Sequence, residues 1–246
     1  MNILSHIITH KQQCSPLLAV LIDPNKQEVY TPILPYLHEV NLIFVGGSTG
    51  QSIEPCIASI RQHTHAPIVL FPGNIAQFSP NADALLFLSL LNAHTVDMLI
   101  TPHIKIAQQV IQSGIETIPM GYILIDGERK STVEIVSNCT PIPQNDINRI
   151  ISTALAGQLL GKQLIYLEAG SGAQKPVSID IIHAVHQQLQ IPLIVGGGIQ
   201  TPQAMIQAFD AGADIVVIGN HFEQHPEQLP LFIHTLSHYE HNHASR

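Results

Sequence analysis

One short stretch decides the fold: PLIVGGGIQTP, at residues 192–202. It begins with an apolar run that ends at Val195 and continues with three glycines. Thr201 and Pro202 then form a typical helix start, because threonine caps a helix N-terminus and proline fits the first helical position. A buried strand, a glycine turn and a helix in this order make up one unit of an α/β protein.

Similar units recur along all 246 residues, with no change in composition that would mark a linker. The apolar runs are nearly continuous rather than alternating, which is typical of parallel strands buried on both faces. Amphipathic segments such as 104–112 and 179–189 lie between them. We therefore predict one domain, residues 1–246, folded as a TIM (β/α)8 barrel, with an open doubly wound sheet as the alternative. The predicted strands are 17–23, 41–45, 67–71, 84–88, 117–125, 163–168, 192–195 and 214–218.

The connection between the third and fourth predicted strands does not fit the pattern. Residues 72–83 number only 12 and contain Pro72, Gly73 and Pro80, which disfavour a helix. We predict an extended segment in place of this helix, and hence a gap in the outer helical ring. Such a gap suits a groove for a long apolar ligand or a subunit interface. The alternative is that residues 85–91 form a helix.

Charge limits the choice of ligand. Lysine and arginine total 10 against 18 acidic residues, giving a formal charge of −8. This balance argues against nucleic acid as a partner. We expect anionic ligands to be bound by backbone amides, helix ends or a metal ion, without basic side chains.

Other features of the chain point to the cytoplasm. Three widely spaced cysteines (Cys14, Cys56 and Cys139) fit a reducing compartment. Residues 1–6 lack a basic or apolar leader, so we expect no signal peptide, and no apolar run is long enough for a membrane span. Six histidines near the C-terminus are interpreted as the polar face of a surface helix, with a metal site as the alternative: His221, His225, His234, His238, His241 and His243.

Glycine clusters follow the seventh and eighth predicted strands. The first is Gly196-Gly197-Gly198, and the second is Gly219 followed by Asn220 and, three residues further on, Glu223. We expect Asn220 to cap a helix with Glu223 as its capping-box partner. In a barrel these two strand ends form the usual phosphate site, because glycine backbones and helix N–H groups accept an anion there.

Two carboxylates stand at other strand ends. Glu168 ends the sixth predicted strand, where it could take a proton from a hydroxyl; a salt-bridged rim residue is the alternative. Asp23 ends the first strand, and Ser48 follows the second. One carboxylate, one hydroxyl and the phosphate oxygens of a ligand suit Mg²⁺. The alternative for Asp23 is a turn before Pro24.

Taken together, these motifs resemble the geranylgeranylglyceryl phosphate synthase family, in its second, partly bacterial group. The resemblance covers almost the whole chain, and its most specific part is the block YLEAGSGA at residues 166–173. It also rests on DPNK (23–26), GGSTG (46–50), FPGN (71–74), GGGI (196–199) and GN (219–220). The family is a TIM barrel that lacks its usual third helix.

The resemblance implies an enzyme that transfers a geranylgeranyl or similar prenyl group from a prenyl diphosphate to the sn-3 hydroxyl of sn-glycerol 1-phosphate, using Mg²⁺. It implies Glu168 as the base, with Tyr166 as the second catalytic residue, and Asp23 and Ser48 as the metal ligands. The residues implied to bind glycerol phosphate are Tyr166, Leu167, Glu168, Ala169, Gly170, Ser171, Gly172, Gly197, Gly198, Gly219 and Asn220.

Two other functions remain open at this point. The first is a phosphate-binding barrel isomerase or lyase acting on a sugar phosphate, which usually needs a lysine or an aspartate pair at strand ends; Lys26 and Asp126 are the candidates. The second is a phosphate- or lipid-binding barrel without turnover. For any of the three we expect a homo-oligomer, since an exposed groove edge favours self-association. Contact with a membrane is expected to be transient at most.

Overall fold

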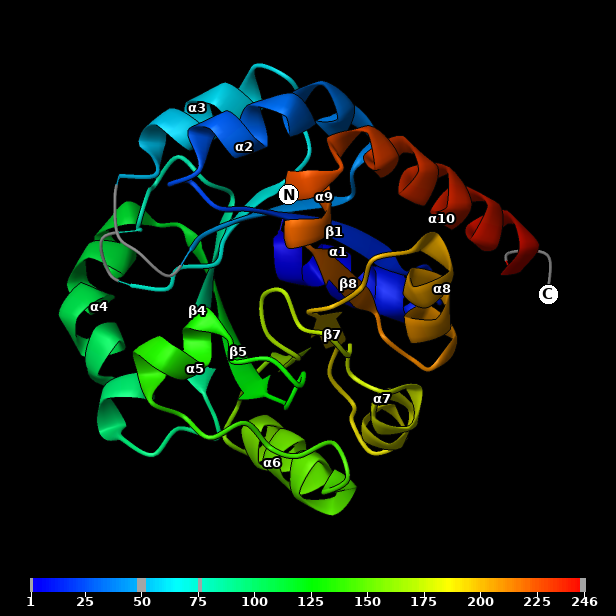
Figure 1. The fold of residues 1–246 in the computed structure, drawn as a ribbon. Coiled ribbons are helices and arrows are strands. Elements are labelled where there is room, and N and C mark those ends of the chain that lie inside the picture. The colour runs from blue at the N-terminus through cyan, green and yellow to red at the C-terminus, as the bar shows by residue number, and fades with distance from the viewer. Residues whose placement is uncertain (1, 48–51, 75–76, 244–246) are drawn as a thin grey trace.

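The computed structural model describes residues 2–47, 52–74 and 77–243. Eight parallel strands close into a barrel in the order β1 to β8, with β8 pairing β1, and helices surround it (Figure 1). The predicted TIM barrel is confirmed, and the open-sheet alternative is wrong. The strands are β1 (Leu17–Ile22), β2 (Leu42–Val45), β3 (Ile68–Leu70), β4 (Ala84–Leu90), β5 (Glu116–Leu124), β6 (Leu164–Glu168), β7 (Leu193–Gly196) and β8 (Ile215–Ile218).

Helices follow most strands, and one further helix precedes β1. The α-helices are α1 (Ile3–Gln12), α2 (Gln27–Tyr30), α3 (Glu54–Arg61), α4 (Thr101–Ser113), α5 (Thr132–Ser137), α6 (Ile147–Leu159), α7 (Ile179–His186), α8 (Pro202–Asp210), α9 (Asn220–Gln224) and α10 (Leu229–His243). Short 3-10 turns are η1 (Thr31–Glu39), η2 (Val96–Met98) and η3 (Pro226–Gln228).

The connection from β3 to β4 contains no helix in its described residues, 72–74 and 77–83. The predicted extended segment is therefore confirmed over that part of the chain. Residues 84–90 form strand β4, so the alternative of a helix at 85–91 is wrong. Strand β4 pairs with β3 and, over a longer register, with β5. A place in the outer ring between α3 and α4 is consequently left without a helix (Figure 1).

Each strand contributes to two apolar layers, because successive side chains point to opposite faces. Phe44, Leu86 and Met120 belong to a cluster that fills the barrel interior. Ile43 and Leu85, their chain neighbours, belong to a second cluster shared with the surrounding helices. Burial on both faces explains why the apolar runs in the sequence do not alternate.

Helix α1 covers the amino-terminal end of the barrel. Its buried Ile3 and Ile7 join the interior cluster, beside residues that begin the strands. Glu116, the first residue of β5, accepts hydrogen bonds from the N–H groups of Ile3 (2.6 Å) and Leu4 (2.8 Å). A carboxylate at a helix N-terminus satisfies N–H groups that have no partner inside the helix. The barrel is therefore closed at this end.

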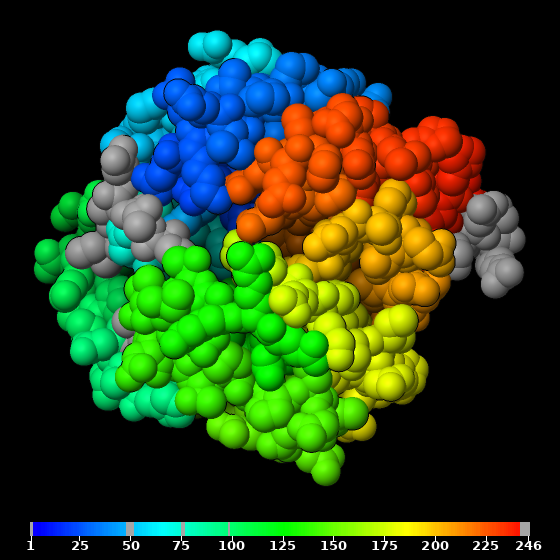
Figure 2. Space-filling model, viewed as in Figure 1, coloured from blue at the N-terminus to red at the C-terminus, as the bar shows by residue number. Residues whose placement is uncertain are grey.

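The carboxyl-terminal end of the barrel carries the connecting loops. In the space-filling view, segments near residues 25, 130, 172 and 222 surround a hollow at the centre of this face (Figure 2). No helix among the described residues is both long and apolar enough to cross a membrane.

Candidate functional site

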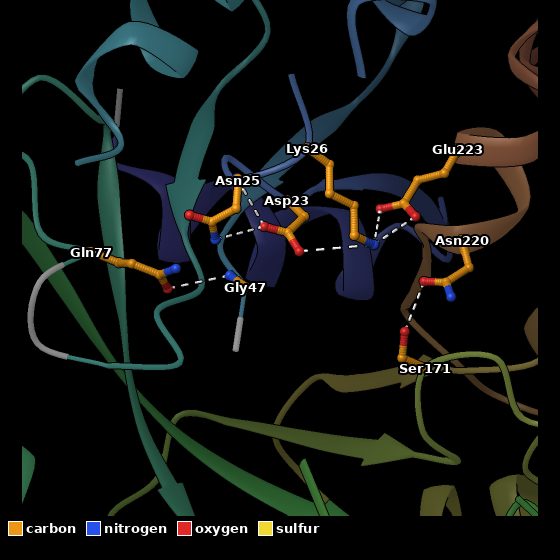
Figure 3. Close-up of polar contacts among 8 residues, drawn as sticks. All are labelled: Asp23, Asn25, Lys26, Gly47, Gln77, Ser171, Asn220 and Glu223. Carbon is orange, nitrogen blue, oxygen red and sulfur yellow. Dashed lines mark hydrogen bonds and ion pairs between the residues drawn. The ribbon is translucent and has the colours of Figure 1, made fainter. Parts of the chain in front are cut away.

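All predicted site residues that the structure describes lie at the carboxyl-terminal end of the barrel, because the eight strands run parallel and end there. Asp23 follows β1, and Glu168 is the last residue of β6. The glycine clusters follow β7 and β8. Figure 3 shows polar contacts among residues that follow β1, β2, β3, β6 and β8 on this face.

Glu168 is a buried carboxylate with local hydrogen-bond partners. Its side chain lies on the inner face of β6, and the residue is only 7% exposed. Oε1 accepts a hydrogen bond from the Gly170 N–H at 2.7 Å, and the carboxylate also accepts one from the Tyr166 hydroxyl. Burial raises the pKa of Glu168, although both hydrogen bonds oppose this shift.

These surroundings bear on the salt-bridge alternative for Glu168. It makes no ion pair with any described residue, so the salt-bridged rim alternative is wrong. A carboxylate with a raised pKa holds a proton more readily than an exposed one. Such a group suits proton transfer in a site that excludes water.

Tyr166 lies below Glu168 and forms part of the aromatic floor of the site. Its ring centroid is 5.5 Å from that of Phe71 and 5.2 Å from that of Tyr122. Tyr166 is 1% exposed, and burial together with the nearby Glu168 charge raises its pKa well above the usual range. The hydroxyl therefore stays protonated and can donate to Glu168.

The predicted substrate-binding block 166–172 is divided between two faces. Leu167 and Ala169 belong to the apolar layer between the barrel and the helices, so their side chains face away from the mouth. Only their backbone can contribute to a ligand site, because residues along a strand alternate in direction. Gly170, Ser171 and Gly172 form the loop that continues over the mouth.

The glycine loop after β7 packs directly on this block. Gly197 and Gly198 have φ of 85° and 74°, in the left-handed region that favours glycine. A side-chain carbon on Gly197 would lie 2.5 Å from Glu168 Oε1 and 2.8 Å from the Gly170 nitrogen. Glycine at 197 thus allows the two loops to approach closely. No hydrogen bond among the described residues uses the N–H of Gly197 or Gly198, so these donors suit an anion.

The loop after β8 differs from its prediction. Helix α9 begins at Asn220 itself, Gly219 is the N-cap, and no side chain caps this helix. The capping-box expectation is wrong because both side chains have partners elsewhere. Asn220 Oδ1 accepts a hydrogen bond from Ser171 Oγ at 2.8 Å, and Glu223 binds Lys26 (Figure 3). The helix start after β7 is as expected: Thr201 Oγ1 accepts the N–H of Ala204 at 3.1 Å.

Asp23 uses its two carboxylate oxygens differently. Oδ1 accepts hydrogen bonds from the backbone and side-chain nitrogens of Asn25, both at 3.0 Å, which is the predicted turn. Oδ2 lies 3.8 Å from Lys26 Nζ, and the side chain is 21% exposed. A side-chain carbon on Gly47 would collide with this carboxylate. Ser48, the other predicted metal ligand, lies outside the described residues.

Basic side chains lie in the loops at this end of the barrel, among them Lys26 and Arg129. The expectation that anionic ligands bind without basic side chains stays a prediction. Lys26 Nζ donates to both oxygens of Glu223, at 2.8 and 2.9 Å. Arg129, in the loop after β5, donates to the Gly172 carbonyl at 3.3 Å. Lys26 is held by a carboxylate, which differs from the lysine base that a barrel isomerase or lyase would need.

The described residues contain no group of three or more histidine, cysteine, aspartate or glutamate side chains able to hold a metal. Mg²⁺ does not require one, because it commonly binds one or two carboxylates together with phosphate oxygens and water. His234 and His238 are exposed on α10, with Nε2 atoms 3.0 Å apart. For these two histidines the predicted polar helix face is confirmed.

Three residues make contacts at this end of the barrel that the sequence analysis did not predict. They are Gln77, Arg129 and Glu223, the last through its ion pair with Lys26. Gln77 Oε1 accepts the N–H groups of Gly47 (3.2 Å) and Gly73 (2.9 Å), and so joins the loops after β2 and β3. Each of the three follows a strand within about a dozen residues. Their position just beyond a strand end is the signal that could have included them.

Comparisons with known proteins identify the family of the chain. A family model described as the PcrB family matches residues 10–235. A relative from Zunongwangia profunda, named geranylgeranylglyceryl phosphate synthase, is 48% identical over 227 residues, or 90% of this chain and 97% of its own. A relative of the same name from Thermococcus kodakarensis is 39% identical over 224 residues, covering 88% of each chain.

Solved structures extend the match to three dimensions. A crystal structure of (S)-3-O-geranylgeranylglyceryl phosphate synthase from Thermoplasma acidophilum, in complex with its substrate sn-glycerol-1-phosphate, has a TM-score of 0.88 and 33% identity. The match covers 96% of this chain and 98% of that one. An N-acetylmannosamine-6-phosphate 2-epimerase from Clostridium perfringens shares the fold alone, with a TM-score of 0.55 and 11% identity. The resemblance to a prenyltransferase is confirmed, and the chain belongs to the PcrB family.

Proposed function

We propose that this protein transfers a geranylgeranyl group, or a similar long prenyl group, from its diphosphate to the sn-3 hydroxyl of sn-glycerol 1-phosphate. The observation that carries the proposal is the placement of Glu168. This buried carboxylate ends β6 and lies directly against Gly197 in the glycine loop after β7. The relative from Zunongwangia profunda is named for this product, and the similar crystal structure from Thermoplasma acidophilum holds this acceptor.

The chemistry needs one base and a way to stabilise a departing anion. The acceptor hydroxyl oxygen forms a bond to the allylic C1 of the donor, and the C1–O bond to the diphosphate breaks with its electron pair. The hydroxyl proton passes to Glu168, whose raised pKa suits it for this acceptance. Tyr166 donates to the same carboxylate and so holds it in position.

We assign the phosphate of the acceptor to the loops after β6, β7 and β8. Gly197 and Gly198 offer backbone N–H groups, and Gly219 and Asn220 open the short α9. Ser171 and Gly172 border the same space from the β6 loop. Backbone donors at these strand ends are the usual phosphate ligands of this fold.

We assign Mg²⁺ to Asp23, together with Ser48. Asp23 fits a hard cation because Oδ2 has only a long contact, 3.8 Å, with Lys26, while Lys26 is held more closely by Glu223. The metal would supply positive charge for the leaving diphosphate. The rest of its coordination would come from diphosphate oxygens and water.

The prenyl tail requires an apolar groove. We expect this groove beside β3 and β4, where the outer ring lacks a helix. At about 0.8 kcal/mol per buried methylene, a twenty-carbon tail supplies much of the binding of the donor. Length selection is tested by offering donors from C15 to C35 together and identifying the products by mass spectrometry.

We further propose that the protein works in the cytoplasm as a homo-oligomer, with contact with the membrane that is transient at most. Exposed Ile104 and Ile111 on α4, and Leu159 and Leu160 at the end of α6, support self-association, since large apolar residues in such numbers favour an interface. Size-exclusion chromatography with light scattering tests this, and a monomer at micromolar concentration would contradict it.

The decisive experiment incubates the purified protein with radiolabelled geranylgeranyl diphosphate, sn-glycerol 1-phosphate and Mg²⁺. An ether product that disappears with EDTA and returns with added Mg²⁺ is expected. Failure to form product with any donor from C15 to C35 would refute the proposal. Binding of both compounds without turnover would instead identify a binding barrel, and turnover of an aldose phosphate without Mg²⁺ would identify an isomerase.

A further inference from the structure

The loop after β5 lies against the loop after β6. The carbonyl oxygen of Gly127 accepts hydrogen bonds from the N–H groups of Gln174 (2.9 Å) and Lys175 (3.2 Å). Lys175 Nζ is also paired with Glu128 at 2.7 Å. These contacts hold the backbone of Gly127 and the side chain of Glu128, and Arg129 is the next residue. Arg129 therefore follows a residue that is tied to the loop after β6.

Arg129 extends from this loop over Gly172. Nη1 donates to the Gly172 carbonyl at 3.3 Å, close to the limit for a hydrogen bond. This single long contact uses one of the five N–H donors of the guanidinium. Among the described residues Arg129 makes no ion pair, and the residue is exposed. The other donors of this exposed guanidinium have no hydrogen-bond partner among the described residues.

A second donor is directed at the same place. An atom in the Cβ position of Gly172 would lie 3.3 Å from Arg129 Nη1 and 3.7 Å from Asn220 Nδ2. The amide of Asn220 is oriented by Ser171, whose hydroxyl donates to Oδ1 and leaves Nδ2 toward Gly172. A guanidinium from the β5 loop and an amide from the β8 loop therefore converge on one point above the β6 loop.

We propose that Arg129 binds the phosphate group of the acceptor, together with Asn220 and the backbone of Gly172. The inference rests on the proposed function and names a ligand of its acceptor phosphate. Convergent N–H donors with one positive charge fit a phosphate monoester dianion, and arginine offers two parallel donors to such a group. Uncharged glycerol would gain nothing from this charge.

The test compares Arg129→Ala, Arg129→Lys and Lys130→Ala with the wild-type enzyme. Lys130 is the matched control, because its loss removes the same charge from the same loop and it is exposed like Arg129. Loss of a charge-assisted hydrogen bond weakens binding by about 10- to 100-fold. We expect Arg129→Ala to raise KM for sn-glycerol 1-phosphate by this factor, while KM for the prenyl diphosphate and the melting temperature stay unchanged.

Three further measurements distinguish an Arg129 that binds phosphate from one that only holds the β5 and β6 loops together. Inorganic phosphate should inhibit the wild type in competition with the acceptor and inhibit Arg129→Ala much more weakly. Arg129→Lys should recover part of the lost affinity, and Lys130→Ala should behave as wild type. An unchanged acceptor KM in Arg129→Ala, or an equal change in Lys130→Ala, would overturn the proposal.

Failure of the Arg129 assignment can be distinguished from failure of the proposed prenyl transfer. If the wild type forms ether product and Arg129→Ala keeps its acceptor KM, the assignment of Arg129 fails alone. If the wild type forms no product, binding of inorganic phosphate is measured directly by calorimetry. Binding that is lost in Arg129→Ala but kept in Lys130→Ala would then support Arg129 as a phosphate ligand, and equal binding in both would refute it.

Discussion

Lys26 Nζ lies 2.8 and 2.9 Å from the two carboxylate oxygens of Glu223, so that an ion pair joins the loop after β1 to α9 after β8. The same ammonium lies 3.8 Å from Asp23 Oδ2. Lys26 thus lies between the carboxylates of Asp23 and Glu223, and its close contact is with Glu223. The ion pair with Glu223 keeps the Lys26 ammonium near Asp23 but too far away to form a close contact with the Asp23 carboxylate.

Glu223→Gln should therefore weaken the response to Mg²⁺. Once released by Glu223, Lys26 has Asp23 as its nearest carboxylate and competes with the metal for Oδ2. We expect the Mg²⁺ concentration for half-maximal activity to rise several-fold. Stability should change little, because a partly exposed ion pair contributes about 0–1 kcal/mol. Glu227→Gln, a matched charge change on the neighbouring turn, should leave the Mg²⁺ titration unchanged; a shift of equal size there would contradict the explanation.

Glu168→Gln should remove the proton acceptor and keep the fold. The amide is nearly isosteric and carries no buried charge, so the melting temperature is expected to hold. Loss of a general base lowers kcat by about 10²- to 10⁴-fold. KM for sn-glycerol 1-phosphate should change far less. Steady-state kinetics with both substrates measure this, and a mutant with wild-type turnover would remove Glu168 from the role of base.

Tyr166→Phe should move the acid side of the pH profile. The Tyr166 hydroxyl donates to Glu168 and lowers the pKa of that carboxyl, so its loss raises the pKa further. Because Glu168 must be ionised to accept a proton, the rate falls as pH drops through its pKa. The wild-type acid limb should lie above the usual glutamate value of about 4.3, and in Tyr166→Phe it should lie higher still.

Tyr122→Phe is the control for that shift. Tyr122 is equally buried and its ring lies 5.2 Å from that of Tyr166, but it makes no hydrogen bond to Glu168. Its loss removes a hydroxyl from the same aromatic floor without removing a donor to the base. The kcat profile of this variant should coincide with that of the wild type. A common shift in both variants would mean that repacking of the floor, rather than the hydrogen bond, controls the profile.

Gly197→Ala should damage both stability and activity. Its φ of 85° is strained for alanine, at a cost of about 1–3 kcal/mol. The added methyl group also meets Glu168 Oε1. Gly114→Ala is the matched control, since Gly114 has φ of 68° and nothing within 4 Å of the added carbon. Urea unfolding should show a smaller loss for Gly114→Ala, with full activity; equal effects would mean that backbone strain alone is responsible.

The sequence predicted the parts of the structure that depend on neighbouring residues. Each predicted strand overlaps the observed one, because strands buried on both faces leave uninterrupted apolar runs. The missing helix was readable from Pro72, Gly73 and Pro80. Glu168 and Asp23 were predicted as site residues because a barrel places its site at the carboxyl ends of its strands.

The remaining features depend on contacts between distant residues. Lys26 and Glu223 are 197 positions apart, and Arg129 reaches Gly172 across 43. Asn220 has the composition of a cap, yet its side chain is taken by Ser171, so tertiary contacts override a local preference. The inward or outward direction of Leu167 follows from the register of β6, which the sequence alone does not determine.

Because helix α1 closes the amino-terminal end of the barrel, that end contributes to stability, while the carboxyl-terminal end is left for the candidate site. The end that it seals carries no predicted catalytic or binding residue among those described, and the opposite end carries the predicted site residues that the structure describes. Substitutions that improve packing around Ile3, Ile7 and Glu116 can therefore harden the scaffold without disturbing turnover. The end of the barrel covered by α1 is therefore the first region to redesign when a more heat-resistant enzyme is wanted.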